Sequence, residues 1–136
     1  MDCIFCSIAN GEIGDTVFYK TEKAVAFLDN QPRVPGHSLV VPKQHVANML
    51  ELDKEMLEPL FETVQKTLDI LDKTLSPDGF TIGINHGKVS GQAVDHLHIH
   101  IFPRFSNDKG GSVHDVVFNP PQESVEEIHK RLMQQQ

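Results

Sequence analysis

The chain has no tryptophan, one tyrosine and only two cysteines among its 136 residues. It has no apolar run near the roughly 20 residues that a membrane-spanning helix needs. Its first residues also lack the basic segment and apolar run of a secretory signal. We therefore expect a cytoplasmic protein with no membrane partner. In that reducing compartment, Cys3 and Cys6 are not expected to form a structural disulfide.

Positive charge is scarce as well. Twelve Lys and Arg stand against nineteen Asp and Glu, which gives a formal net charge of −7. Proteins that bind nucleic-acid backbones need a clustered cationic surface, so we expect no nucleic-acid partner. One small phosphate group needs only a few local donors, so the composition does not exclude a mononucleotide.

The length suits one compact domain, and the chain shows no repeat or linker. Runs rich in β-branched and aromatic residues predict strands at 16–20, 24–28, 38–41, 80–85 and 94–102. Apolar residues at three- and four-residue steps predict helices over 53–75 and 124–133. Asp53 is a candidate N-cap, and Pro59 predicts a kink or an irregular first turn. These elements predict an α+β fold, with helices packed on one face of an antiparallel sheet.

The most informative segment is Asp95–Pro103, where His96, His98 and His100 alternate with apolar residues. Because side chains alternate between the two faces of a strand, the three imidazoles should share one face. Two chemistries suit such a row. The imidazoles can ligate a metal ion together. Alternatively, one can attack phosphorus while its neighbours fix its tautomer and move protons.

The loop before this segment offers donors for a phosphate group. Asn85 has a side-chain amide, and Gly91 and Gln92 can present backbone N–H groups to an anion. Lys88 can add positive charge. On its own the loop would be an ordinary glycine-containing turn, but beside the histidine row we interpret it as a phosphate cradle.

Cys3 and Cys6 form a C-x-x-C motif close to the start of the chain. The motif alone is weak evidence, because two small buried residues would look the same. A thioredoxin-like redox role is disfavoured because no strand precedes the motif. A zinc site needs four ligands, so two histidines would have to come from elsewhere.

The sequence resembles the histidine-triad (HIT) family, in its Hint/Hit branch. The family signature His-φ-His-φ-His-φ-φ, with φ apolar, matches residues 96–102. Further matches are Ala-Phe-Leu-Asp at 26–29, Pro-Gly-His at 35–37, Leu-Val-Val-Pro-Lys-Gln-His at 39–45 and Gly-Gln at 91–92. The resemblance covers residues 2–104. It implies one HIT domain over 1–136, with a C-terminal extension and helix at 105–136, a five-stranded antiparallel sheet with two helices, and a homodimer with a ten-stranded sheet.

The resemblance implies a purine-nucleotide hydrolase or transferase that acts at the α-phosphate. Phosphoramidates, aminoacyl adenylates and dinucleoside polyphosphates are the implied substrates. His98 would form a nucleotidyl-histidine that water then hydrolyses, and His100 and His37 would orient the site. Asp29 would accept hydrogen bonds from the ribose hydroxyls. The remaining nucleotide-binding positions are implied to be Ile4, Phe5, Ile8, Phe27, Leu28 and Asn30 around the base, and Asn85, Gly91, Gln92 and Ala93 at the phosphate.

Ala93 departs from the family pattern. Many relatives carry Ser or Thr there, whose hydroxyl is thought to serve the leaving group, whereas Ala93 offers only its backbone N–H. Lys88 or a water molecule would then serve, or turnover would be slow, or the leaving group would need less help. A non-catalytic nucleotide sensor or scaffold therefore stays an alternative, as does a metal-dependent hydrolase that uses the histidine row.

The resemblance also completes the zinc set. Several bacterial members of the family supply ligands from positions that match His45 and His96. With Cys3 and Cys6 these give a full C2H2 set, and four protein ligands close the coordination shell. A zinc ion bound there would be structural and would not activate water.

Overall fold

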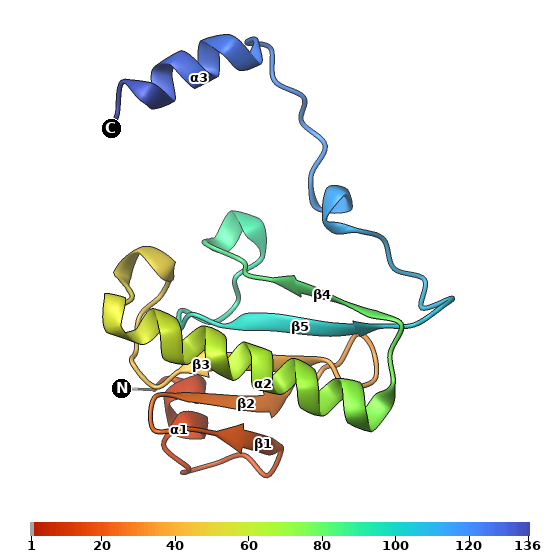
Figure 1. Cartoon of the computed structure of the whole chain (residues 1–136). Helices are drawn as coiled ribbons and strands as arrows, with labels where there is room; N and C mark the ends of the chain where they lie inside the picture. The colour runs from red at the N-terminus through yellow and green to blue at the C-terminus, as the bar shows by residue number, and fades with distance from the viewer. Residues whose placement is uncertain (1) are drawn as a thin grey trace.

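The computed structural model describes residues 2–136 and contains a five-stranded antiparallel sheet in the order β1-β2-β3-β5-β4 (Figure 1). This confirms the predicted α+β class. The elements are α1 (Ile4–Ala9), β1 (Val17–Lys20), β2 (Ala24–Leu28), β3 (Ser38–Pro42), α2 (Leu57–Leu75), β4 (Gly79–Gly83), β5 (Ile99–Arg104) and α3 (Val125–Met133). Short 3-10 turns lie at Met49–Glu51, Lys54–Met56, Lys88–Ser90 and Val113–Val116.

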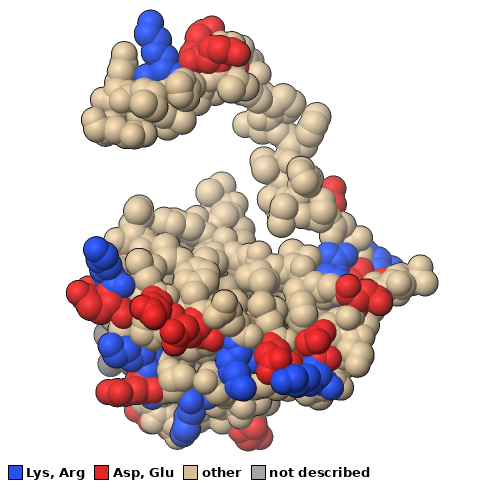
Figure 2. All heavy atoms as spheres, in the orientation of Figure 1, with Lys and Arg blue, Asp and Glu red and all other residues tan. Residues whose placement is uncertain are grey.

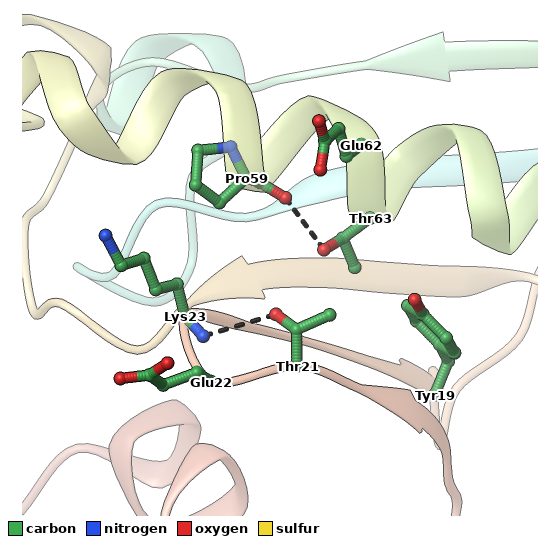
Figure 3. A pocket seen from close by; sticks show the side chains of 7 residues that line it. All are labelled: Tyr19, Thr21, Glu22, Lys23, Pro59, Glu62 and Thr63. Atoms are coloured by element: carbon green, nitrogen blue, oxygen red, sulfur yellow. Dashed lines mark hydrogen bonds between the residues drawn. The ribbon is translucent and has the colours of Figure 1, made fainter.

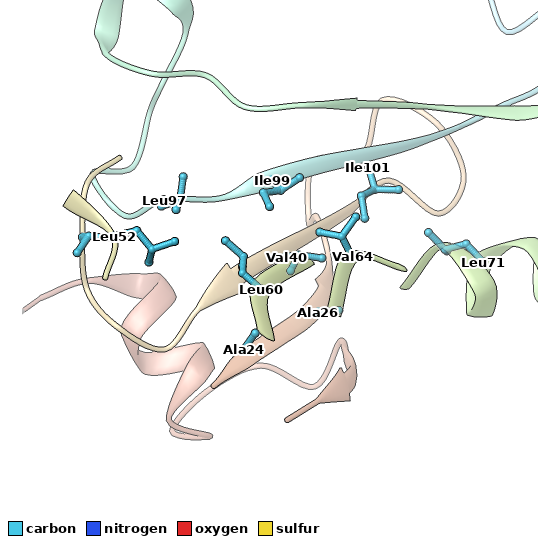
Figure 4. Close-up of a cluster of buried hydrophobic side chains, with 11 residues drawn as sticks. Ala24, Ala26, Val40, Leu52, Leu60, Val64, Leu71, Leu97, Ile99 and Ile101 are labelled. Carbon is cyan, nitrogen blue, oxygen red and sulfur yellow. The ribbon is translucent and has the colours of Figure 1, made fainter. Parts of the chain in front are cut away.

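The two faces of the sheet are covered by different helices. α2 lies across one face, and the cluster drawn in Figure 4 joins it to the sheet. That cluster consists of Ala24, Ala26, Val40, Val46, Leu52, Leu60, Val64, Leu71, Leu97, Ile99 and Ile101. α1 packs on the opposite face, where Phe5 and Ala9 contact the other side of β2 and β3. The prediction that the helices pack on one face therefore holds for α2 only, because α3 stands apart from the sheet and α1 is a further helix that was not predicted.

α2 begins later than its predicted start. The chain first makes the 3-10 turn Lys54–Met56, so Asp53 precedes that turn and its side chain caps nothing. Pro59 is the third residue of α2. Backbone N–H groups in the first turn have no intrahelical acceptor, so a proline there removes no helical hydrogen bond. The predicted irregular entry is present, but it lies before the helix rather than within it.

β5 differs from the predicted strand at both ends. Val94–His98 lie outside it, and the backbone N–H of Leu97 donates to the carbonyl of Val46 (2.7 Å) instead of a sheet neighbour. β5 also continues through Pro103. The pairing with β3 ends at Ile101, so on that side the missing proline N–H costs no ladder hydrogen bond. The predicted alternation still holds, since Leu97 and Ile101 are both buried under α2.

α3 forms where it was predicted, but it stands apart from the sheet at the end of a long extended segment (Figure 1). Its apolar side chains are largely exposed: Val125 by 73%, Leu132 by 60% and Met133 by 54%. The apolar face of this helix therefore has no core of its own chain to cover it.

Charged side chains of both signs are interspersed on the face seen in Figure 2, and no extended cationic patch is visible on that face. None of the helices within residues 2–136 combines the length and apolar character needed to cross a bilayer.

Candidate active site

His98 lies just before β5 and is almost completely buried. Its Nδ1–H donates to the backbone carbonyl oxygen of His96 (2.7 Å). A neutral imidazole carries one N–H, so this bond leaves the Nε2 of His98 unprotonated with a free lone pair. The ring of Phe5 packs edge-on against it, with 5.0 Å between centroids. The backbone thus fixes both the tautomer and the orientation that a nucleophilic imidazole needs.

His37 and His100 form a second imidazole pair beside His98. The backbone N–H of Arg33 donates to Nδ1 of His37 (3.2 Å), so the hydrogen of His37 is on Nε2. That Nε2–H donates to Nδ1 of His100 (3.0 Å). His100 must then carry its own hydrogen on Nε2, where it can donate to a ligand. The backbone N–H of Arg33 therefore fixes the tautomer of His37 and, through it, the tautomer of His100.

Burial keeps this pair neutral near pH 7. Desolvation is the main cause that lowers the pKa of His100 to about 4, helped by the neighbouring His98 and His37 and opposed by Asp29. Desolvation likewise lowers the pKa of His37. Neutral imidazoles donate and accept hydrogen bonds without adding positive charge.

Asp29 has two roles in the structure. One carboxylate oxygen accepts the backbone N–H of Gln31 (2.9 Å), as in an ordinary turn. The other lies 3.5 Å from Nε2 of His37. The carboxylate also lines a cavity of about 490 Å³ that includes His37, His100 and Asn85. The turn and the site interpretations of this residue are therefore compatible.

Two residues fix the shape of the loop before the triad: Gly91, through its left-handed backbone conformation, and Gln92, through its side-chain hydrogen bonds. Gly91 has φ +107°, which side-chain-bearing residues rarely adopt. Gln92 is buried, and its Nε2 donates to the carbonyls of Ala47 (2.7 Å) and Val94 (3.1 Å). Its Oε1 accepts from the N–H of Gly87 (2.8 Å). All side-chain donors of Gln92 are thus already used. The backbone N–H groups of Gly91 and Gln92, which were predicted to face an anion, also donate within the loop, to the carbonyls of Lys88 (3.0 Å) and Gly87 (3.2 Å). The predicted phosphate contacts would therefore require breaking these bonds.

The residues predicted to surround the base separate into buried and exposed ones. Phe5 and Phe27 are buried and contact each other, with 5.6 Å between ring centroids. Ile4 and Leu28 are substantially exposed. The exposed and half-buried positions of this set, which also include Ile8 and Asn30, are the ones that a ligand could touch.

The ring of His96 turns away from the cavity and toward the cysteines. Its Nδ1 lies 3.4 Å from Sγ of Cys3 and 3.3 Å from Nδ1 of His45, while Sγ of Cys6 lies 3.2 Å from the same His45 nitrogen. The Nε2–H of His96 donates to the carbonyl of Pro42 (2.8 Å). That bond leaves Nδ1 as a lone pair facing the cysteines, as metal-bound histidines require. Two thiols and two imidazoles within 4.8 Å fit a tetrahedral zinc ion.

The three histidines of the row therefore do not converge on one ion. Among residues 2–136, the candidate ligand atoms gather into Cys3/Cys6/His45/His96 and Asp29/His37/His100, and His98 belongs to neither group. This arrangement disfavours a metal-dependent hydrolase that uses the whole row.

A second hollow of about 220 Å³ lies between α2 and the β1–β2 turn (Figure 3). Its two threonines are engaged within the protein: Oγ1 of Thr63 donates to the carbonyl of Pro59 (2.8 Å), and Oγ1 of Thr21 accepts from the N–H of Lys23 (3.2 Å). No imidazole lines it. The larger cavity, in contrast, is lined by the imidazoles of His37 and His100.

Comparison with known proteins identifies a match to the HIT domain over residues 10–107. A HIT-like protein of Methanocaldococcus jannaschii is 47% identical over 106 residues, which is 78% of this chain and 81% of that one. Two Schizosaccharomyces pombe proteins are 37% identical. One is an adenosine 5′-monophosphoramidase, matched over 110 residues (81% and 80% of the chains). The other is an asymmetrical bis(5′-nucleosyl)-tetraphosphatase, matched over 107 residues (79% and 58%). The crystal structure of a HIT-family member from Bacillus subtilis superposes with a TM-score of 0.85 at 31% identity, covering 98% of this chain and 94% of that one.

Proposed function

The chain belongs to the HIT domain family, and from that premise we propose that it is a nucleotide hydrolase or transferase in which His98 attacks the α-phosphate of a purine nucleotide conjugate. The observation that carries the proposal is the hydrogen bond from Nδ1 of His98 to the carbonyl of His96, which frees Nε2 as the nucleophile. The activities named for the two S. pombe relatives, a phosphoramidase and a tetraphosphatase, support nucleotide hydrolysis.

In the first step, the Nε2 lone pair of His98 forms a bond to the α-phosphorus, and the bond from phosphorus to the leaving group breaks. The leaving group takes the electron pair of that bond and a proton from solvent or a nearby donor. The imidazole becomes cationic as Nε2 bonds to phosphorus. Its Nδ1–H then faces the carbonyl of His96, a fixed acceptor that stabilises the new charge.

In the second step, water attacks the same phosphorus and releases a proton to solvent. The bond between Nε2 and phosphorus breaks, its electron pair returns to Nε2 as the neutral imidazole is restored, and the nucleoside monophosphate leaves. His100 would donate its Nε2–H to a phosphoryl oxygen during both steps, because its other nitrogen is occupied by His37. Asp29 would accept hydrogen bonds from the ribose hydroxyls at the edge of the same cavity. Asn85, which lines the same cavity, would supply an amide donor for the phosphate.

Protonation of the leaving group is the step for which the chain provides the fewest donors. Ala93 is exposed and has no hydroxyl, and Lys88 lies on the exposed 3-10 turn of the same loop. An amine leaves only after its nitrogen has been protonated, so a phosphoramidate would take that proton from water or from Lys88. The phosphoramidase activity named for the S. pombe relative that matches over 80% of its length supports small adenosine or guanosine phosphoramidates as our first choice of substrate, with dinucleoside polyphosphates second.

We further propose that Cys3, Cys6, His45 and His96 hold a structural zinc ion. A bound zinc ion would supply cross-linking of the N-terminal segment to the triad and no catalytic water, since four protein ligands fill its shell. The backbone carbonyl of His96 is the acceptor that orients His98. A fixed His96 ring would therefore hold the nucleophile in place.

We also propose a homodimer in which the edge strands of two sheets pair to give a ten-stranded sheet. β4 is an edge strand, and Ile82 within it is 41% exposed. Pairing of β4 with its copy would bury that edge. Light scattering during gel filtration would test it: a mass of one chain would contradict the dimer.

The direct test of the catalytic proposal is to trap the intermediate. The protein is mixed with an adenosine phosphoramidate, quenched within milliseconds, digested and sequenced by mass spectrometry. An adenylyl group on His98 is the expected result. Hydrolysis without any adduct on His98 would overturn the covalent route, whereas nucleotide binding without hydrolysis would favour the sensor alternative.

A further inference from the structure

The chain that follows β5 runs past the edge strand β4 before it reaches α3 (Figure 1). Residues 111–116, here called the strap, include the 3-10 turn Val113–Val116. The strap lies beyond residue 107, where the family match ends. Even so, it forms one wall of the 490 Å³ cavity, through Gly111, Ser112, Val113 and Val116.

Arg104, the last residue of β5, ties the strap to the sheet. Its Nε and Nη2 donate to the carboxylate of Asp108 (2.6 and 3.0 Å). Its Nη1 donates to the carbonyl of Gly111 (2.6 Å) and to Oγ1 of Thr81 in β4 (2.9 Å). One planar guanidinium thus connects β5, β4 and the first residue of the strap, a geometry that an ammonium group cannot reproduce.

Asp108 is the partner of Arg104, and we call this pair of residues the latch. Its carboxylate also accepts the backbone N–H groups of Phe105 (3.1 Å) and Gly110 (2.9 Å). The hydrogen bonds from Arg104 hold the pKa of Asp108 well below its usual range, so the carboxylate stays ionised at neutral pH. A Cβ at Gly110 would lie 2.6 Å from Nη2 of Arg104, so glycine permits the close approach.

The strap has a shape of its own. Ser112 and Asp115 form a capping box: the N–H of Ser112 donates to the Asp115 carboxylate (2.8 Å), and Oγ of Ser112 accepts from the N–H of His114 (3.3 Å). A Cβ at Gly111 would collide with that carboxylate. The strap is therefore a preformed turn that hangs on Arg104 and presents Val113 and Val116 to the cavity.

We propose that Arg104 is a positioning residue which holds the strap as a wall of the cavity, and that this wall selects the group attached to the α-phosphate. The inference rests on the proposed function. In the strand order β2-β3-β5-β4, the base and ribose residues lie on the α1 and β2 side of the triad, and the strap is joined to β4. A nucleotide bound to His98 would therefore direct its leaving group toward Val113, Val116 and Ile82.

The test compares two substrates of the unmodified chain and of Arg104→Lys. Adenosine 5′-phosphoramidate loses ammonia, which is too small to reach the strap, whereas its N-benzyl derivative loses an apolar amine. In Arg104→Lys we expect kcat/KM for the benzyl substrate to fall about tenfold, mainly through KM, and that for the ammonia substrate to change less than about twofold. Arg131→Lys is the matched control, because Arg131 pairs with Glu123 far from the cavity.

Val116→Ala provides a second variant that leaves the latch intact, and it should show the same loss of preference for the benzyl substrate. Hydrogen exchange provides a readout without turnover: amides of the strap should exchange about tenfold faster in Arg104→Lys. Equal losses on both substrates, an unchanged preference, or unchanged exchange would each overturn the inference. Inactivity of the unmodified chain on both substrates would instead overturn the proposed function, and the claim of selection would fall with it.

Discussion

Two groups of side chains flank His98, and they are equally compact. In each group the candidate ligand atoms lie within 4.8 Å of one another. One group joins His96 and His45 to two thiols, and the other joins His37 and His100 to a carboxylate. Spacing alone would make either of them a metal site.

The two groups differ in the hydrogen bond that the far nitrogen of one imidazole in each group makes with the backbone. The far nitrogen of His96 donates to the carbonyl of Pro42, so its near nitrogen keeps a lone pair for a cation. The far nitrogen of His37 accepts from the backbone N–H of Arg33, so its near nitrogen carries a proton. A backbone carbonyl thus prepares one imidazole to bind a metal ion, and a backbone amide prepares the other to donate a hydrogen bond. Nδ1 of His98 donates to the backbone carbonyl of His96, which leaves its Nε2 lone pair free for the attack that we propose.

The largest effect should come from the residue that belongs to neither group. We expect His98→Ala to lower kcat for an adenosine phosphoramidate by about 10³-fold or more, because the attacking nitrogen is lost. Zinc content and AMP affinity should change little, as measured by elemental analysis and calorimetry. The exposed His129→Ala serves as a control. Activity close to that of the unmodified chain would show that another group performs the attack.

Removing one ligand from each group should separate their roles. Cys6→Ser should reduce bound zinc from about one ion per chain toward none and lower the melting temperature by about 5 °C or more. Asp29→Asn should keep the zinc and the melting temperature but raise KM, because the ribose loses its charged acceptor. Plasma mass spectrometry, thermal melts and kinetics measure the three quantities.

Chelation gives the same comparison without mutation. Prolonged treatment with a strong chelator should lower the melting temperature of the unmodified chain and leave Cys6→Ser unaffected. If Asp29→Asn lost zinc as readily as Cys6→Ser, the proposed division between a metal group and a hydrogen-bonding group would be wrong.

The buried His100 should make stability depend on pH. Its pKa, about 4 in the folded chain, is below the value near 6.5 of an unfolded chain. The unfolded chain therefore binds more protons between these values, so stability is full above pH 6.5 and declines as the pH falls toward 4. The contribution of His100 over this window is about 2 to 3 kcal/mol, since one pKa unit corresponds to about 1.4 kcal/mol.

Urea titrations between pH 7 and 4 would check this. His100→Gln should lose stability less steeply than the unmodified chain, and His129→Gln should follow the unmodified chain. Some dependence should remain in His100→Gln, because burial also lowers the pKa of His37 and His96. Parallel curves for all three proteins would show that His100 binds protons equally well folded and unfolded.

The sequence predicted the sheet and the shared face of the three imidazoles because both depend on period-two alternation, which is local. It also brought Cys3, Cys6, His45 and His96 together, but only through resemblance, since residues 3 and 96 meet solely by tertiary folding. The orientation of each imidazole ring could not be predicted from the sequence. It depends on the backbone carbonyl of Pro42 and the backbone N–H of Arg33, groups that every position of this kind has whatever its side chain.

Two other features escaped for related reasons. α3 was expected to pack on the sheet because its apolar face is clear in the sequence, but periodicity does not say what covers such a face. The strap was predicted only as part of the C-terminal extension, although the sequence contains the residues that hold it, namely Arg104, Asp108, Gly110 and Gly111. Only the contact of Arg104 with Gly111 in the structure reveals that pairing.

The smallest effect is expected for Gln92, in the loop before the triad. Gln92 was predicted to meet the phosphate, but its amide joins Gly87, Ala47 and Val94. If it is a brace, Gln92→Ala should cost about 2 kcal/mol, because buried partners lose their hydrogen bonds. Gln92→Glu should cost more, since a buried carboxylate would face two carbonyl oxygens. If Gln92 is a phosphate ligand, both variants should instead keep their stability and lose AMP affinity, with Glu the weaker binder. Denaturant titration and calorimetry on the same samples distinguish the two outcomes, because the order of the variants appears in stability for a brace and in binding for a ligand.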